Sequence, residues 1–329
     1  MSTKSELLKL LTENQGEFVS GQAIAAQLDV SRNSIWKAVA RLKEDGYRIE
    51  SKTNAGYRLV GSDNILTFDT VMQGVDRDCG LEIFDTVTST NDLLKEKMAV
   101  PGPHEKPLIY IANRQTGGRG RLGRKFESPA GTGLYISFGL KPDFDIDKAL
   151  FVTMASAVAT CRAIEKVCPL KAEIKWVNDI YVNEKKVCGI LTEGVTSFES
   201  GQIDSLVIGI GINCFPGSFP PEIADKAGTL AQDPSEFSRS SLAAEMINEV
   251  LALIDVIETR EFFKEYRNRC FILGRPIRIH PNYNDVGIPA TALDIAEDGG
   301  LIVEYTDGID KGKRETLHTG EISISIADL

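Results

Sequence analysis

The sequence predicts an α/β protein of several domains, because three patterns of secondary structure follow one another. Residues 1–62 show three short helices and a β-hairpin, residues 63–269 mix apolar strands with helices and glycine-rich connections, and residues 270–329 show short strands separated by turns. A chain of 329 residues is long enough for two or three hydrophobic cores. We therefore expect three domains with these boundaries.

The composition is typical of a globular protein in a reducing compartment. Hydrophobic residues make up 42% of the chain and charged residues 26%. The sequence has no run of about 18 apolar residues, and its first residues, MSTKSELLKL, lack the pattern of a signal peptide. Six scattered cysteines and three histidines predict buried thiols and no structural metal site. We therefore expect a cytoplasmic protein that does not bind a membrane.

The amino-terminal residues carry positive charge in an otherwise acidic chain. Residues 1–60 hold nine Lys and Arg against seven Asp and Glu, whereas the net charge of the whole chain is −10. A capping box opens a first helix at Thr3, residues 20–28 predict a second helix, and residues 31–46 predict a third with one apolar face. The segment YRIESKTNAGYRLV then predicts a β-hairpin. This order predicts a winged helix-turn-helix, with the helix-turn-helix at about residues 21–40.

A winged helix-turn-helix reads DNA with its third helix in the major groove and contacts phosphates with its hairpin, the wing. The side chains that we expect to contact DNA are Arg32, Asn33, Lys37 and Arg41 of the helix and Lys52 and Arg58 of the wing. The alternative is a small helical domain whose charges only solvate its surface. The acidic remainder of the chain weakens non-specific DNA binding, which favours a site-specific regulator.

The rest of the chain alternates strands and helices before it becomes all-β. Buried strands are predicted for the apolar runs at residues 107–115, 133–140 and 205–215, and a hairpin for residues 173–191. Helices are predicted for residues 148–167, 240–257 and 260–269. After Cys270, three short segments with turn residues between them predict a small β-barrel.

The most unusual segment is the cationic loop GGRGRLGRKF, Gly117–Phe126, between two predicted strands. It contains a G-x-G-x-x-G pattern, but the dinucleotide fingerprint requires a helix after the last glycine, and here a proline, two glycines and a strand follow. Glycines allow close backbone approach and arginines offer forked donors, so we expect the loop to fold over a carboxylate or phosphate of a small molecule. The alternatives are a nucleic-acid patch of the RG type and a solvated loop.

Several segments, in this order, resemble the signature of one family. They are TSTND (88–92), Gln115, GRGRLGR (118–124), KWVNDIYVNEKKVCGIL (175–191), GIGIN (209–213) and GEIS (320–323). Together they resemble the biotin protein ligases over essentially the whole chain. With the winged helix at the amino end, the chain is similar to the bifunctional form of that family, which also represses the biotin operon.

The resemblance implies a central catalytic domain of the biotin/lipoate-ligase type and a small SH3-like barrel at the carboxyl end. It implies that ATP, with Mg²⁺, activates biotin to biotinyl-5′-AMP, and that biotin then passes to a lysine of a biotin carboxyl carrier domain. It also implies that the adenylate-bound protein forms a homodimer that binds operator DNA. Two alternatives are a non-enzymatic winged-helix regulator that senses a small anion, and a lipoate-type ligase.

The resemblance also assigns roles to residues. The residues that it implies for biotin binding are Ser89, Thr90, Asn91, Gln115, Arg119, Gly120, Arg121 and Lys186. Those that it implies for ATP and adenylate binding are Arg121, Arg124, Phe126, Asn178 and Lys186. The catalytic residues that it implies are Lys186, Arg121 and Asp179.

The hairpin at residues 173–191 adds a geometric expectation. A turn centred on Asn183 and Glu184 sets Tyr181 opposite Lys186, with Asp179 diagonally placed on the same face of the sheet. Lys186 could then bridge a carboxylate and a phosphate. The alternative is an exposed ion pair, which contributes less than about 1 kcal/mol to stability.

Two residues depart from the family pattern. Val177 replaces a proline, which could loosen the strand, although matching residues on both sides lead us to expect an intact site. Phe126 stands where the family often has tryptophan, and we expect it to pack near the adenine. The two tryptophans present, Trp36 and Trp176, are expected to be packing residues.

Overall fold

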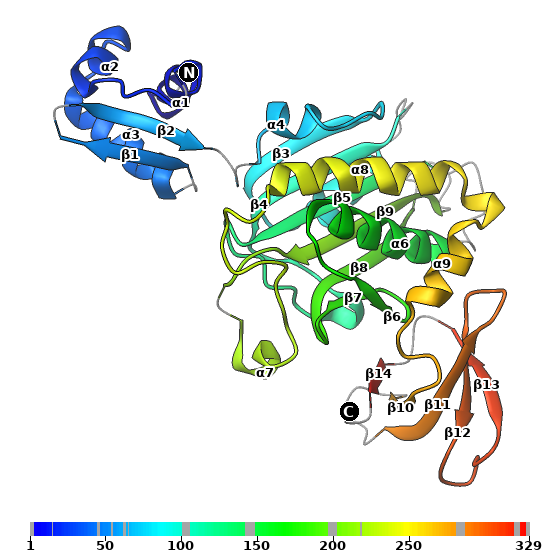
Figure 1. Cartoon of the computed structure of the whole chain (residues 1–329). Coiled ribbons are helices and arrows are strands. Elements are labelled where there is room, and N and C mark those ends of the chain that lie inside the picture. The colour runs from blue at the N-terminus through cyan, green and yellow to red at the C-terminus, as the bar shows by residue number, and fades with distance from the viewer. Residues whose placement is uncertain are drawn as a thin grey trace.

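The computed structural model describes residues 3–14, 16–44, 47–53, 55–61, 64, 66–100, 106–141, 149–196, 203–217, 219–280, 287–318 and 323–326. The described residues form sheets of two, seven and five strands, which Figure 1 shows in chain order. The first three residues of the GEIS segment, 320–322, lie outside these ranges.

The amino-terminal residues form the predicted winged helix-turn-helix. Its elements are α1 (Thr3–Glu13), α2 (Gly21–Gln27), α3 (Arg32–Glu44), β1 (Arg48–Lys52) and β2 (Gly56–Gly61). The two strands are antiparallel. Apolar side chains from all three helices and both strands form a separate small core. Each helix has one apolar face, which is removed from water only when it packs against the other elements.

The central sheet has the strand order β3-β4-β5-β9-β8-β7-β6, in which only the β3–β4 pair is parallel. Its strands are β3 (Gly80–Val87), β4 (Leu108–Gln115), β5 (Gly133–Leu140), β6 (Glu173–Lys175), β7 (Asp179–Val182), β8 (Lys185–Thr196) and β9 (Ile203–Asn213). The predicted strands and the hairpin are therefore confirmed to within a few residues. The strands β5 and β9 lie in the middle of this sheet.

Helices cover both faces of the central sheet. They are α4 (Phe68–Met72), α5 (Thr90–Ala99), α6 (Ala149–Val167), α8 (Arg239–Asp255) and α9 (Phe262–Arg269). The short helix α7 (Pro221–Ala224) lies in the connection between β9 and α8, which Figure 1 shows extending away from the sheet. Figure 1 shows α6 and α8 side by side over one face, and α6 is so deeply buried that its sequence is apolar nearly all round. Leu94 and Met98 of α5 pack on Tyr110 and Val207, which point to the opposite face because side chains alternate along a strand.

The carboxy-terminal residues form a five-stranded antiparallel sheet in the order β13-β12-β11-β10-β14. Its strands are β10 (Pro276–His280), β11 (Ile288–Ile295), β12 (Leu301–Tyr305), β13 (Arg314–Leu317) and β14 (Ser323–Ile326). The all-β prediction is confirmed as a small sheet, whereas its closure into a barrel stays a prediction. Trp176 joins this sheet to the central one, because its indole Nε1 donates to the carbonyl of Gly299 at 3.0 Å.

The two tryptophans differ in burial. Trp176 is buried, as expected, but Trp36 on α3 is 61% exposed. The prediction that Trp36 packs in a core is therefore wrong. Trp36 comes directly after Ile35, which faces the core. Because successive side chains of an α-helix are about 100° apart, Trp36 is directed away from that core. In the part of the chain that the structure describes, no helix is long and apolar enough to span a membrane.

Candidate active site

A cavity of about 650 Å³ lies between the cationic loop Gly117–Phe126, the amino end of α5, and the β7–β8 hairpin. Every ligase-site residue named from the sequence lines it: Ser89, Thr90, Asn91, Gln115, Arg119, Gly120, Arg121, Arg124, Phe126, Asn178, Asp179 and Lys186. The fold thus brings together segments that are up to about a hundred residues apart in the sequence. The cavity has two chemically different ends, which we call the polar end and the cationic end.

The polar end consists of Ser89, Thr90, Asn91 and Gln115. Ser89 caps α5, since its Oγ accepts the backbone N–H of Asp92 at 3.3 Å. The backbone N–H and the hydroxyl of Thr90 both donate to Gln115 Oε1, at 2.8 and 3.1 Å. The Ser89, Thr90 and Asn91 side chains are buried, so these contacts fix neutral donors and acceptors in position for a polar ligand.

Two residues that could not be recognised from the sequence, Ser137 and Glu193, form hydrogen bonds with the side chains of the polar end. The Ser137 hydroxyl on β5 is fully buried and lies 2.7 Å from Thr90 Oγ1 and 2.6 Å from Asn91 Oδ1. Glu193 on β8 accepts the Asn91 side-chain amide at 2.9 Å. A serine within the apolar run GLYISFGL was the one available signal for Ser137, and no local pattern indicates Glu193.

The glycines of GIGIN make room for two of these side chains. A Cβ on Gly209 would come within 2.2 Å of Asn91 Oδ1, and a Cβ on Gly211 within 2.5 Å of the Phe126 ring. The ring of Phe126 also meets the edge of Tyr135, with 6.4 Å between the centroids. Strand β9 therefore contributes its bare backbone to the cavity floor, because any side chain there would displace a lining residue.

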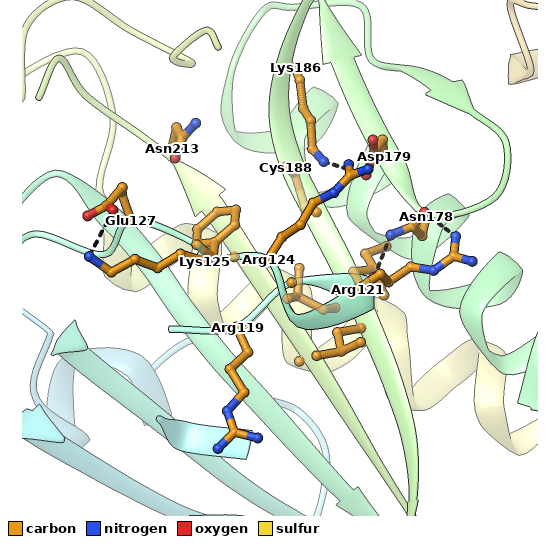
Figure 2. Close-up of a pocket in the computed structure, with 18 of the residues that line it drawn as sticks. Arg119, Arg121, Arg124, Lys125, Glu127, Asn178, Asp179, Lys186, Cys188 and Asn213 are labelled. Carbon is orange, nitrogen blue, oxygen red and sulfur yellow. Dashed lines mark hydrogen bonds and ion pairs between the residues drawn. The ribbon is translucent and has the colours of Figure 1, made fainter. Parts of the chain in front are cut away.

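The cationic loop folds into a compact arch over the cavity. Gly120 donates its N–H to the carbonyl of Arg124 at 2.7 Å, and Phe126 donates to the carbonyl of Gly118 at 2.9 Å. Between these bonds, Arg121–Gly123 forms a single 3₁₀ turn. The guanidinium of Arg121 donates to Asn178 Oδ1 at 3.0 Å, which ties the arch to the hairpin side of the cavity. Figure 2 shows Arg121 and Arg124 directed towards Asn178 and Asp179.

The cationic end, defined by Arg121, Arg124, Lys175 and Lys186, holds more positive than negative charge. Burial lowers the pKa of Arg121, and the neighbouring Arg124 lowers it further although Asp179 opposes both. Burial also lowers the pKa of Lys175. Cations that lose hydration and repel one another are costly unless an anion joins them, so this end of the cavity is suited to a polyanionic ligand.

At its turn the hairpin has the register that the sequence predicted, and an irregularity between Ile180 and Tyr181 shifts the pairing beyond the turn. Asn183 and Glu184 occupy the turn at positive φ angles of 48° and 63°, and Tyr181 pairs with Lys186. Lys186 Nζ lies 2.6 Å from Asp179 Oδ1. Both side chains line the cavity, so this contact is not an isolated pair on a solvated face (Figure 2).

Comparison with known proteins places the chain in a family. Residues 83–213 match the Biotin/lipoate A/B protein ligase family and residues 3–58 match an HTH domain. The chain is 31% identical to "Bifunctional ligase/repressor BirA" of Bacillus subtilis (strain 168), over 94% of this chain and 96% of that protein. The chain belongs to the biotin protein ligase family, in its bifunctional ligase/repressor form.

Other members of the family agree in sequence and in fold. "Bifunctional ligase/repressor BirA" of Escherichia coli (strain K12) is 27% identical over 98% of this chain and 97% of its own length. "Biotin protein ligase from Aquifex aeolicus in complex with biotin and ATP" superimposes with a TM-score of 0.62 at 27% identity, and covers 75% of this chain and 99% of its own. The family assignment thus rests on nearly the whole length of the chain.

The departure at Val177 leaves the hairpin of this biotin protein ligase family member intact. Val177 is buried, the Trp176–Val177 peptide bond is cis, and the Val177 carbonyl accepts the hydroxyl of Tyr266 at 3.0 Å. Strands β6 and β7 pair on either side of it, with Lys175 opposite Asp179. The pairing of the two strands is therefore kept, whereas an intact site at Val177 stays a prediction.

The DNA-facing residues predicted for the repressor half lie where α3 and the wing expose them, with one exception. Arg32, Asn33, Lys37, Arg41 and Lys52 are exposed. Arg58, in contrast, is paired with Glu50 at 2.6 Å and its guanidinium lies 4.5 Å from the Phe18 ring centroid. The contacts of all six residues with DNA stay predictions, and Arg58 would meet phosphate as a partner of Glu50.

Proposed function

We propose that this protein activates biotin with ATP, transfers it to a lysine of a biotin carboxyl carrier protein, and represses biotin operon transcription when it holds biotinyl-5′-AMP. The observation that carries the proposal is a single cavity that joins a buried polar end to a cationic end. Biotin has the matching halves, since its ureido ring is neutral and hydrogen-bonding while its valerate ends in a carboxylate. ATP supplies the second anion.

In this proposal the ureido ring of biotin binds the polar end. Ser89, Thr90, Asn91 and Gln115 offer short side chains whose positions are already fixed, so little conformational freedom is lost on binding. Arg119 and Gly120 line the same cavity where the loop crosses it. The valerate chain then directs the carboxylate towards Arg121 and Lys186.

Adenylation takes place at the cationic end. A carboxylate oxygen of biotin attacks the α-phosphorus of ATP, and the bond from that phosphorus to the bridging oxygen breaks as pyrophosphate leaves. Lys186 bridges the carboxylate and the α-phosphate, while Arg121 and Arg124 neutralise charge that grows on the phosphate oxygens. Phe126 packs near the adenine, and Asn178 orients the nucleotide.

Magnesium fits this site as a companion of ATP. The structure brings the Asp179 carboxylate and the Asn178 amide oxygen to the cationic end, and Mg²⁺ bound to nucleotides needs only one or two protein oxygens besides phosphate and water. When bound, the ion would reduce the negative charge of the phosphates that the carboxylate approaches.

Transfer takes place in the same cavity. The ε-amino nitrogen of the carrier lysine attacks the carbonyl carbon of biotinyl-5′-AMP, AMP leaves, and the new bond is an amide. Asp179 accepts the proton that the amine loses. The closed loop shelters the mixed anhydride from water until the carrier arrives.

The repressor function links this site to the winged helix. We propose three domains, residues 1–62, 63–269 and 270–329, with the last closed into an SH3-like barrel. The adenylate-bound protein forms a homodimer whose two recognition helices bind a palindromic operator. The carrier and the operator are both cytoplasmic, which is where we place the protein.

The first test is the release of pyrophosphate on mixing the protein with ATP, Mg²⁺ and biotin, with lipoate and octanoate as alternative acids. Of the three acids, we expect only biotin to cause pyrophosphate release, and we expect the Lys186→Ala variant to lose this release. Lys185→Ala is the matched control, because Lys185 is the neighbouring exposed lysine and does not line the cavity. Biotin binding without release would support the non-enzymatic regulator, and release with lipoate would support the lipoate-type ligase.

A further inference from the structure

Arg119 behaves differently from the other arginines of the cationic loop. Figure 2 shows its side chain directed away from Arg121, Arg124 and Lys186. Its Nη2 lies 3.0 Å from Oδ2 of Asp92, the residue that follows the polar end in the first turn of α5. Arg119 therefore adds its charge to the α5 side of the cavity and not to the cationic end.

Asp92 is part of a connected set of charged side chains. Lys95 Nζ lies 3.2 Å from Asp92 Oδ1 and 2.7 Å from Glu193 Oε1, and Glu193 in turn accepts the amide of Asn91. The side chains of Asp92, Lys95 and Glu193 are only 21%, 24% and 26% exposed. Without Arg119 these three carry a net charge of −1, and Arg119 brings the set to neutrality.

We propose that Asp92 is a positioning residue that anchors the Arg119 end of the cationic loop to α5. The loop then has an anchor on each wall of the cavity, Arg119 with Asp92 on one side and Arg121 with Asn178 on the other. The backbone between the anchors crosses the cavity. Because Lys95 and Glu193 tie Asp92 to Asn91, the anchor and the polar end form one unit.

The anchor has a consequence for catalysis that rests on the proposed function. A loop pinned at both sides keeps biotinyl-5′-AMP in the cavity, whereas a loop pinned only through Arg121 opens more often on the α5 side. Arg119 is 57% exposed, so the ion pair is partly screened by solvent. We therefore expect the loss of the anchor to change loop opening and adenylate dissociation by about two- to fivefold.

Hydrogen–deuterium exchange of the ligand-free full chain tests the anchor without reference to ligase activity. In Asp92→Asn and in Arg119→Gln, amides of residues 116–126 should exchange about two- to fivefold faster than in the unaltered protein, and the double variant no faster than either. Asp92→Glu should restore slow exchange, because it keeps the carboxylate. Asp78→Asn is the matched control, since it removes an exposed carboxylate that pairs with Lys106 at 3.0 Å.

If Asp92→Asn destabilises α5, Arg119→Gln still tests the proposal. It breaks the same ion pair by changing the more exposed of the two side chains. Unchanged or slower loop exchange in both variants would overturn the proposal, and so would fast exchange in Asp92→Glu. Dissociation of biotinyl-5′-AMP, measured afterwards, should accelerate in the same variants. Failure to form the adenylate at all would count against the proposed function and leave the exchange result standing.

Discussion

Lys186 and Asp179 form an ion pair across the β7–β8 hairpin, with 2.6 Å between Nζ and Oδ1, inside the wall of the cavity. The two residues reach the same point from strands that are antiparallel neighbours, so the ion pair links these strands beside the cavity. In the proposed reaction they have different roles, since Lys186 serves adenylation, while Asp179 serves transfer and also offers an oxygen to Mg²⁺. That division of roles can be tested by changing the carboxylate alone.

Asp179→Asn should slow the transfer of biotin to the carrier by about a hundredfold, because an amide cannot accept the proton of the incoming amine. Pyrophosphate release should fall by less than about tenfold, since asparagine still fills the space beside Lys186. Single-turnover transfer from preformed biotinyl-5′-AMP measures the first effect. Asp225→Asn, at an exposed acid outside the cavity lining, is the control. Equal losses in both steps would mean that Asp179 acts only by holding Lys186.

The two glycines of strand β9 predict a separation of substrate effects. Gly209→Ala should raise the KM for biotin, because its Cβ would meet Asn91 at 2.2 Å. Gly211→Ala should raise the KM for ATP, because its Cβ would meet the Phe126 ring at 2.5 Å. We expect about tenfold in each case, by analogy with other overpacked sites. Steady-state kinetics with each substrate varied in turn is the measurement.

A matched glycine checks that these effects are local. Gly217 lies near the same sheet, and the nearest atom to an added Cβ there is 3.4 Å away, so Gly217→Ala should leave both KM values within about twofold. If Gly209→Ala and Gly211→Ala raised the same KM, the polar end and the Phe126 side of the cavity would not bind different substrates.

The hairpin and the cationic loop could be predicted because their signals are local. Asn183 and Glu184 sit between alternating strands, which fixes the register and hence which side chains face one another. Ser137 and Glu193 could not be predicted in the same way, since their contacts with Asn91 join residues far apart in the sequence. The anchor between Arg119 and Asp92 was hidden for the same reason. The segments of the site could therefore be recognised in the sequence, but the contacts between them could be identified only in the folded structure.

Lys175 predicts a trade-off between stability and binding. Burial lowers its pKa below the ordinary value of 10.5, and Asp179 offsets this only in part. Lys175→Met should therefore raise the free energy of unfolding of the ligand-free protein by about 1 kcal/mol at pH 7, because it removes a partly buried charge. The same change should raise the KM for ATP, because it removes a cation from the cationic end. Urea unfolding and initial rates measure the two effects.

The stability that Lys175→Met adds should decrease as the pH rises. The folded pKa of Lys175 lies below its unfolded pKa, so between the two values the unfolded state binds more protons and stability rises with pH. Below the folded pKa the lysine is charged in both states, so the full cost of removing this charge from water is present. The advantage of Lys175→Met should therefore shrink as the pH approaches 10.5. An advantage that grows with pH would show that the charge of Lys175 is stabilising.

Trp36 gives a prediction for the repressor half, from an exposed aromatic ring on the recognition helix. The ring is 61% exposed, and it lies on α3 among the exposed Arg32, Asn33 and Lys37. Large apolar side chains on such a helix can contact thymine methyl groups in the major groove. Trp36→Ala should therefore lower operator affinity by about tenfold, while the melting temperature and pyrophosphate release stay unchanged.

The thymine contact can be separated from a general loss of affinity. Fluorescence anisotropy with operators in which single thymines are replaced by uracil should reveal positions where the unaltered protein loses affinity and Trp36→Ala loses nothing further. Lys52→Ala should instead weaken binding to all sequences and reduce the dependence on salt, because it removes a wing cation that we expect to contact phosphate. If Trp36→Ala lowered the melting temperature by several degrees, Trp36 would contribute to the stability of the folded domain, and the loss of affinity could not be assigned to a thymine contact.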